Sequence, residues 1–179
     1  MSAGWSLLAP DWCEVDAVWK NPLPFILWPV CGKPLLAHWL DEALRQEANS
    51  ITIYATDRPH LIRAWINRGN YWSNQIHVRV GGDRVESNVT YTMDSLPGYE
   101  VFDSVSDGHR LLEHWFALHV YEIQERKPTR FQIDREISPG VWVAPGVVID
   151  PLARLIPPVW IGRRARIGPH CRIGPNAFI

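Results

Sequence analysis

The chain has 179 residues, 46% of them hydrophobic, and is therefore long enough for one or two domains with a sizeable core. Its formal net charge of −1 argues against nucleic acid or an anionic membrane as a partner of the whole chain. Three widely spaced cysteines, Cys13, Cys31 and Cys171, argue against a disulfide framework. We see no signal peptide or membrane-spanning pattern, and the cytoplasm is the expected compartment.

Residues 1–136 alternate between strand-like and helix-like patterns. Gly32 and Pro34 mark a helix start, and each predicted helix carries apolar residues at helical spacing. The predicted elements, in chain order, are a strand at 5–9, a helix at 35–44, a strand at 51–55, a helix from residue 59, strands at 76–80 and 89–93, and a helix near 108–125. This order predicts an α/β domain with a mainly parallel sheet.

Residues 137–179 carry a strict six-residue period. The aliphatic residues at this spacing are Ile137, Val143, Ile149, Leu155, Ile161, Ile167, Ile173 and Ile179. A small or β-branched residue lies two positions before the last seven, so both side chains point to the same side of a short strand. Glycine and proline then predict a corner, at which Gly140, Gly146, His170 and Asn176 suit a left-handed backbone. Pro158 cannot adopt that conformation, so its corner should differ.

This pattern resembles the hexapeptide-repeat family, whose fold is a left-handed parallel β-helix with three hexapeptides per coil. The residue before each aliphatic residue should point outward. One face would then carry three aromatic residues: Trp142, Trp160 and Phe178. Three aromatic side chains on one face need a cover, which is either the α/β domain of this chain folded back on them or another chain in an oligomer. The ten tryptophans of the chain also favour extra interface.

The charge is unevenly divided. From residue 137 onward there are five arginines and one aspartate, a formal charge of +4, which leaves −5 on residues 1–136. The second face of the predicted β-helix would carry Val148 and Arg166, and the third face Arg154 and Arg172.

Residues 24–34, Pro-Phe-Ile-Leu-Trp-Pro-Val-Cys-Gly-Lys-Pro, with the helix and strand that follow, resemble the sugar-1-phosphate nucleotidyltransferases. That family has a Rossmann-like nucleotidyl domain, often followed by a left-handed β-helix. The resemblance implies a Rossmann-like domain over 1–136 and a β-helix over 137–179. It also implies a Mg²⁺-dependent reaction of a nucleoside triphosphate with a sugar phosphate. Gly32, Lys33 and Asp83 are the candidate nucleotide contacts. Gly81 and Gly82, before Asp83, predict a hairpin turn or a small anion nest.

The residues on which the family's chemistry depends are changed here. The glycine-rich phosphate loop would fall on residues 10–15, which read Pro-Asp-Trp-Cys-Glu-Val, without a glycine and with two acids. Phe25 stands where the family has a lysine that stabilises phosphate charge. Loss of one such group raises the activation free energy of the reaction by about 3 kcal/mol. We therefore expect no catalytic residues and no metal site.

Three hypotheses follow. The first is a non-catalytic relative of the nucleotidyltransferases that needs no cofactor and forms a homo-oligomer or associates with a related active subunit. The second is an active nucleotidyltransferase that uses Mg²⁺, Lys33 and an acid such as Asp83. The third is an acyltransferase acting at the repeats through His170, although its place in the period favours a corner residue.

Overall fold

The computed structural model describes residues 4–10, 12, 20–69, 75–81, 89–99, 108–125 and 134–179. The chain forms two compact units. The first comprises Met1–Pro29 and Lys33–His114, and the second comprises Val30–Gly32 and Trp115–Ile179. The last part of helix α4 therefore belongs to the same unit as the repeats, as do three residues from early in the chain.

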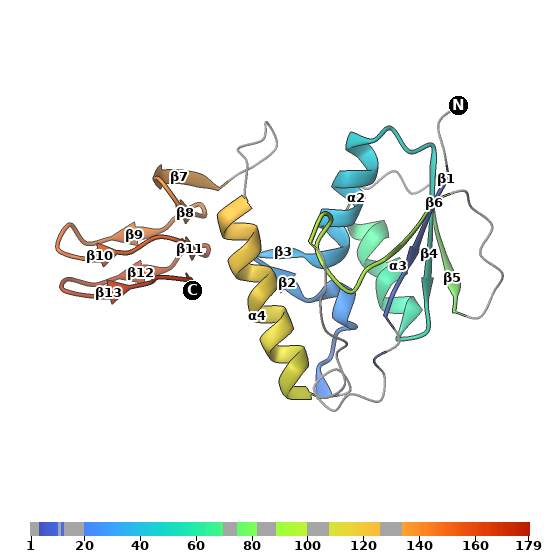
Figure 1. Ribbon diagram of the computed structural model, residues 1–179, viewed down its shortest axis with the longest axis horizontal. Helices are drawn as coiled ribbons and strands as arrows, with labels where there is room; N and C mark the ends of the chain where they lie inside the picture. Colours follow the sequence, from blue (N-terminus) through green and yellow to red (C-terminus); the bar gives the residue numbers. More distant parts are fainter. Residues whose placement is uncertain are drawn as a thin grey trace. The chain divides into compact units, whose positions relative to one another are not determined.

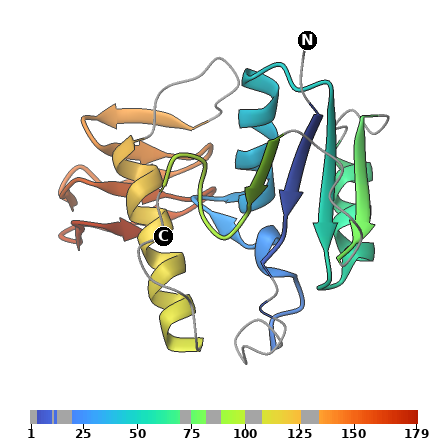
Figure 2. The ribbon, with the colours of Figure 1, turned by 45° about the vertical axis from the view of Figure 1, so that its right-hand side comes forward.

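The first unit contains a four-stranded sheet in the order β5-β4-β1-β6, with every neighbouring pair parallel. Its elements are β1 (Gly4–Leu8), η1 (Phe25–Leu27), α2 (Leu35–Arg45), β4 (Ser50–Ala55), α3 (Pro59–Arg68), β5 (Ile76–Val80) and β6 (Val89–Thr92). The steps from β1 to β4 and from β4 to β5 go in the same direction, so right-handed crossovers place α2 and α3 on one face (Figure 2). The predicted parallel α/β sheet is confirmed.

Alternation along the central strands explains the core of this unit. Trp5 and Leu7 of β1 lie in register with Ile51 and Ile53 of β4, and all four are buried. Residues in register on parallel strands point to the same face, so these four side chains form one apolar layer. The predicted hairpin at Gly81 and Gly82 is wrong, because β5 and β6 lie at opposite edges of the sheet.

A two-stranded ribbon of β2 (Pro29–Val30) and β3 (Lys33–Pro34) precedes α2. Its turn is formed by Cys31 and Gly32, with φ angles of +46° and +77°. Two successive positive φ angles are typical of the tight turns that join paired strands.

The second unit contains a three-sided parallel β-helix (Figure 1). Its elements are α4 (Gly108–Glu125, from Trp115 on), β7 (Arg135–Ser138), β8 (Val141–Val143), β9 (Val148–Ile149), β10 (Arg154–Leu155), β11 (Val159–Ile161), β12 (Arg166–Ile167), β13 (Arg172–Ile173) and β14 (Ala177–Phe178). The parallel pairs are β8-β11-β14, β9-β12 and β10-β13, so each coil takes three hexapeptides as predicted.

The interior of the β-helix is the predicted aliphatic stack, with Val159 and Ile161 fully buried. Five corner residues have φ between 60° and 78°: Gly140, Gly146, Arg164, His170 and Asn176. The corner at Pro158 differs as expected, since the peptide bond between Pro157 and Pro158 is cis.

The prediction that Ile137 belongs to the aliphatic stack is wrong. It lies in β7, which pairs antiparallel with β8 and is not a strand of the coil, and its side chain is 42% exposed. The coil itself therefore begins at Val141.

The register of β10 and β13 allows a test of how charge repulsion between neighbouring strands affects the stability of the protein. Arg154 lies directly opposite Arg172, and like charges in register destabilise a sheet, so Arg154→Glu replaces a repulsion with an attraction. We expect the free energy of unfolding to rise by about 0.5–1 kcal/mol in a urea titration. Arg166→Glu is the matched control, because its register neighbour is the uncharged Val148. An equal gain in both variants would contradict the assignment of the effect to this pair.

Candidate functional site

The carboxyl ends of the four parallel strands share one edge of the sheet, which is where open α/β sheets bind their ligands. Trp12 follows β1 within a few residues, and Asp57 and Arg58 follow β4 directly. This edge is therefore the place to look for a nucleotide site in the first unit.

An aromatic cluster lies beside this edge. The ring centroid of Phe25 is 4.6 Å from that of Trp12, 5.4 Å from that of Trp28 and 6.4 Å from that of His114. Phe25 is only 3% exposed. The imidazole of His114 is held by a hydrogen bond of 2.5 Å between Nε2 and the carbonyl oxygen of Asp94. The position expected to hold a phosphate-binding lysine is thus the centre of a packed apolar cluster.

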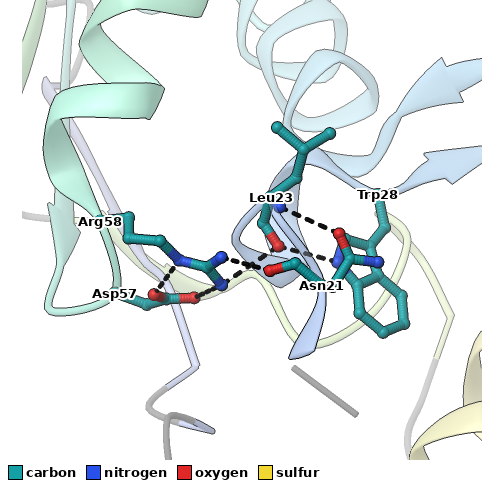
Figure 3. Close-up of polar contacts among 5 residues, drawn as sticks. All are labelled: Asn21, Leu23, Trp28, Asp57 and Arg58. Atoms are coloured by element: carbon teal, nitrogen blue, oxygen red, sulfur yellow. Dashed lines mark hydrogen bonds and ion pairs between the residues drawn. The ribbon is translucent and has the colours of Figure 1, made fainter. Parts of the chain in front are cut away.

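The guanidinium group of Arg58 donates hydrogen bonds to other residues of the first unit (Figure 3). Its Nε and Nη2 donate to the two carboxylate oxygens of Asp57 at 2.6 and 2.8 Å. Its Nη1 donates to the carbonyl oxygen of Asn21, and Nη2 also donates to that of Leu23. The indole Nε1 of Trp28 donates to the same Leu23 oxygen at 3.1 Å. These bonds tie the segment before η1 to the turn between β4 and α3.

The ion pair of Arg58 also bears on metal binding. Asp57 accepts with both carboxylate oxygens from a guanidinium group, so it does not fit the Mg²⁺ site that the resemblance implies. Among the residues that the structure describes, no group of three or more His, Cys, Asp and Glu side chains is placed to hold a metal ion.

Of the three candidate nucleotide contacts, the structure describes Gly32 and Lys33, which are consecutive in the chain. Lys33 forms an ion pair with Asp41 of α2. Gly32 belongs to the second unit, where a Cβ atom at this position would lie 2.8 Å from Cζ2 of Trp160. Asp83 lies outside the described residues. Lys33 and Gly32 thus both make contacts within the protein, and their contact with a nucleotide stays a prediction.

Trp142, Trp160 and Phe178 lie in register on β8, β11 and β14, and we call them the aromatic ladder. Cys31 and Ile123 pack against it in one hydrophobic cluster, which leaves Trp142 3% and Trp160 9% exposed. The indole Nε1 of Trp160 donates to Oδ2 of Asp134 at 3.0 Å. The sequence left open whether the same chain or a second chain covers the ladder. Here Cys31 and Ile123 of the same chain cover it. An interface with a second chain at the ladder stays a prediction.

Helix α4 contributes three aromatic rings around Phe178. The ring of His119 stacks on Phe178 with centroids 4.0 Å apart, while Trp115 and Phe116 lie at 5.8 and 5.5 Å. The carbonyl oxygen of His119 accepts a long hydrogen bond of 3.7 Å from the thiol of Cys31. Burial lowers the pKa of His119, and the hydrogen bond of Nδ1 to the carbonyl oxygen of Trp115 opposes that effect.

His170 lies at an exposed corner of the β-helix with a φ of 61°, the left-handed conformation expected at that position. None of the described helices is long and apolar enough to cross a bilayer.

Comparison with known proteins agrees with the geometry of the repeats. Residues 140–175 match a protein family described as bacterial transferase hexapeptide (six repeats). The match supports the left-handed parallel β-helix for this part of the chain. No curated protein and no solved structure matches the chain.

Sequence reasoning missed two features of these sites. The first is the role of Arg58, because Asp57-Arg58-Pro59 reads as an ordinary helix start and the partners of Arg58 are backbone carbonyls. The second is the contact of Gly32 with Trp160. The only signal for it is the Cys-Gly pair between two short apolar segments, which is compatible with a tight turn.

Gly32 provides a test of the cover over the aromatic ladder. Gly32→Ala should lower the free energy of unfolding by about 2 kcal/mol or more, because alanine disfavours a positive φ and its Cβ atom would overlap the Trp160 ring. Gly168→Ala is the matched control, since a Cβ atom there meets nothing within 4 Å, and it should change stability by less than about 0.5 kcal/mol. Equal losses in urea titrations of both variants would refute this role of Gly32.

His119 provides a test of pH dependence. Its pKa is lowered in the folded protein from the ordinary value of 6.5, so below that pH the unfolded chain binds the proton more readily. The stability of the wild type should therefore fall as the pH falls below 6.5, by at most about 1.4 kcal/mol per pH unit from this group. His119→Phe keeps an aromatic ring against Phe178 and should remove this part of the dependence. Parallel stability curves for the two proteins between pH 5 and 7.5 would contradict the prediction.

Proposed function

We propose that this protein is a catalytically degenerate relative of the sugar-1-phosphate nucleotidyltransferases and acts as an oligomerising, regulatory or scaffold subunit. The resemblance of residues 24–34 and the parallel sheet before a β-helix support the lineage. The changes at Pro10–Val15 and Phe25 support the loss of catalysis.

The packing of Phe25 carries this proposal. Phosphate transfer requires cationic or N–H groups aimed at the phosphates, and these groups must be free to approach them. At the carboxyl edge of the sheet, Phe25 is instead buried against Trp12 and Trp28. An aromatic ring offers a phosphate no hydrogen bond.

The cations near the resemblance motif support the same conclusion. Arg58 is engaged by Asp57 and by two backbone carbonyl groups, and Lys33 is paired with Asp41. Releasing either cation toward a triphosphate would break an existing ion pair. The alternative, an active Mg²⁺-dependent enzyme, is favoured by the Gly32-Lys33-Pro34 motif, which matches the family's own.

Calorimetry with nucleoside triphosphates and nucleotide sugars, with and without Mg²⁺, separates the two functions. We expect no binding heat at ligand concentrations up to about 1 mM, which corresponds to a binding free energy weaker than about −4 kcal/mol. A pyrophosphate-release assay with sugar 1-phosphates should likewise give no product. Micromolar binding of any of these nucleotides would overturn the proposal.

Lys33→Ala is the variant that follows if binding is seen. For an active enzyme it should abolish both the binding heat and pyrophosphate release. For a scaffold it removes only the partly exposed pair with Asp41, and the cost should be below about 1 kcal/mol of stability.

A further inference from the structure

The two faces of the β-helix away from the aromatic ladder carry a concentration of arginines, which we call the arginine surface. Its members are all exposed: Arg154, Arg163, Arg164, Arg166 and Arg172. They come from β10, β12, β13 and the corner before β12. Within the described residues, none of these five guanidinium groups has an ion pair or side-chain hydrogen bond.

The register of the strands makes this surface unfavourable in the free protein. Arg154 lies opposite Arg172 on neighbouring parallel strands, with backbones about 4.8 Å apart. Like charges placed directly opposite each other destabilise a sheet. The one acid of the repeats, Asp150, uses its Oδ1 to accept a hydrogen bond from the backbone N–H of Leu152. A ligand with negative charges would remove this repulsion.

The chemistry of the surface favours a protein as that ligand. All five cations are arginine, and the repeats contain no lysine. Arginine is enriched and lysine depleted at protein interfaces, because the planar guanidinium group binds carboxylates with two parallel hydrogen bonds. Exposed aliphatic residues lie among the arginines, with Val148 in register with Arg166 and Leu152 at the next corner, each 59% exposed. A phosphate backbone offers these aliphatic side chains no apolar surface to pack against.

We propose that the arginine surface binds a separate partner protein through a surface rich in aspartate and glutamate with aliphatic residues among them. This inference rests on the proposed scaffold role and names the chemistry of the partner. Three acids of the described part of the first unit, Asp41, Glu42 and Asp57, are paired with cations of their own chain, which lowers the charge that a second copy could offer.

Fluorescence anisotropy with labelled model ligands tests the proposal on the full chain. The probes are poly-L-glutamate, a glutamate-rich peptide with interspersed leucines, and oligothymidylate, all matched in charge. We expect the leucine-containing peptide to bind most tightly, and the affinities for both peptides to fall as NaCl is raised. Vesicles containing phosphatidylserine, examined by co-sedimentation, should not retain the protein.

Charge reversal locates the binding site. Arg154→Glu/Arg172→Glu should weaken peptide binding at least tenfold with an unchanged circular dichroism spectrum. The control, Arg68→Glu/Arg135→Glu, makes the same change of net charge at exposed residues that are not members of the arginine surface and should change binding less than twofold. Val148→Ser/Leu152→Ser should remove the advantage of the leucine-containing peptide over poly-L-glutamate.

Four results would overturn the inference. Tighter binding of oligothymidylate than of either peptide would identify a nucleic-acid surface, and retention by the vesicles would identify a membrane surface. A mass from light scattering that doubles at low salt in the wild type, but not in Arg154→Glu/Arg172→Glu, would identify a second copy as the occupant. Equal losses in the charge-reversal pair and its control would show only a general effect of net charge. Nucleotide calorimetry decides the proposed function separately, so the two can fail independently.

Discussion

The second unit depends on the burial of the aromatic ladder. A coil of three hexapeptides returns the chain to the same face, so Trp142, Trp160 and Phe178 align on successive coils. Large aromatic side chains bury 150–250 Å² each, and in this unit Cys31, Ile123 and the rings of α4 remove them from water. The close approach at Trp160 is possible because residue 32 has no Cβ atom. A glycine that resembles part of a nucleotide-binding motif therefore serves side-chain packing.

In the first unit, Arg58 has a comparable role at the carboxyl edge of the sheet. It combines a left-handed backbone, with a φ of 44°, with hydrogen bonds that hold the segment before η1. Phe25, which follows this segment, packs with Trp12 and Trp28. Open α/β sheets bind their ligands at this edge, and here it carries a hydrophobic cluster, which agrees with the proposed loss of catalysis.

The faces of the β-helix differ in what they contribute. The face with the aromatic ladder is covered and contributes to stability, whereas the faces with Arg154, Arg166 and Arg172 remain exposed and unneutralised within the described residues. Arg154 and Arg172 lie directly opposite each other, and a bound acidic partner, as proposed above, would remove the repulsion between them. The proposed scaffold role rests on the packing of Phe25, and the arginine surface adds the chemistry of the proposed partner.

The six-residue period, the corners and the alignment of the aromatic ladder were predictable because a repeat fixes local geometry and neighbouring coils at once. The parallel sheet was predictable from the alternation of strands and helices. The burial of the ladder by Cys31 and α4, and the use of Arg58 by the carbonyl oxygens of Asn21 and Leu23, were not predictable. These contacts join segments distant in sequence through backbone atoms or the absence of a Cβ atom, and neither leaves a pattern in residue types. Ile137 shows the converse, since it fits the period although an antiparallel strand keeps it out of the coil.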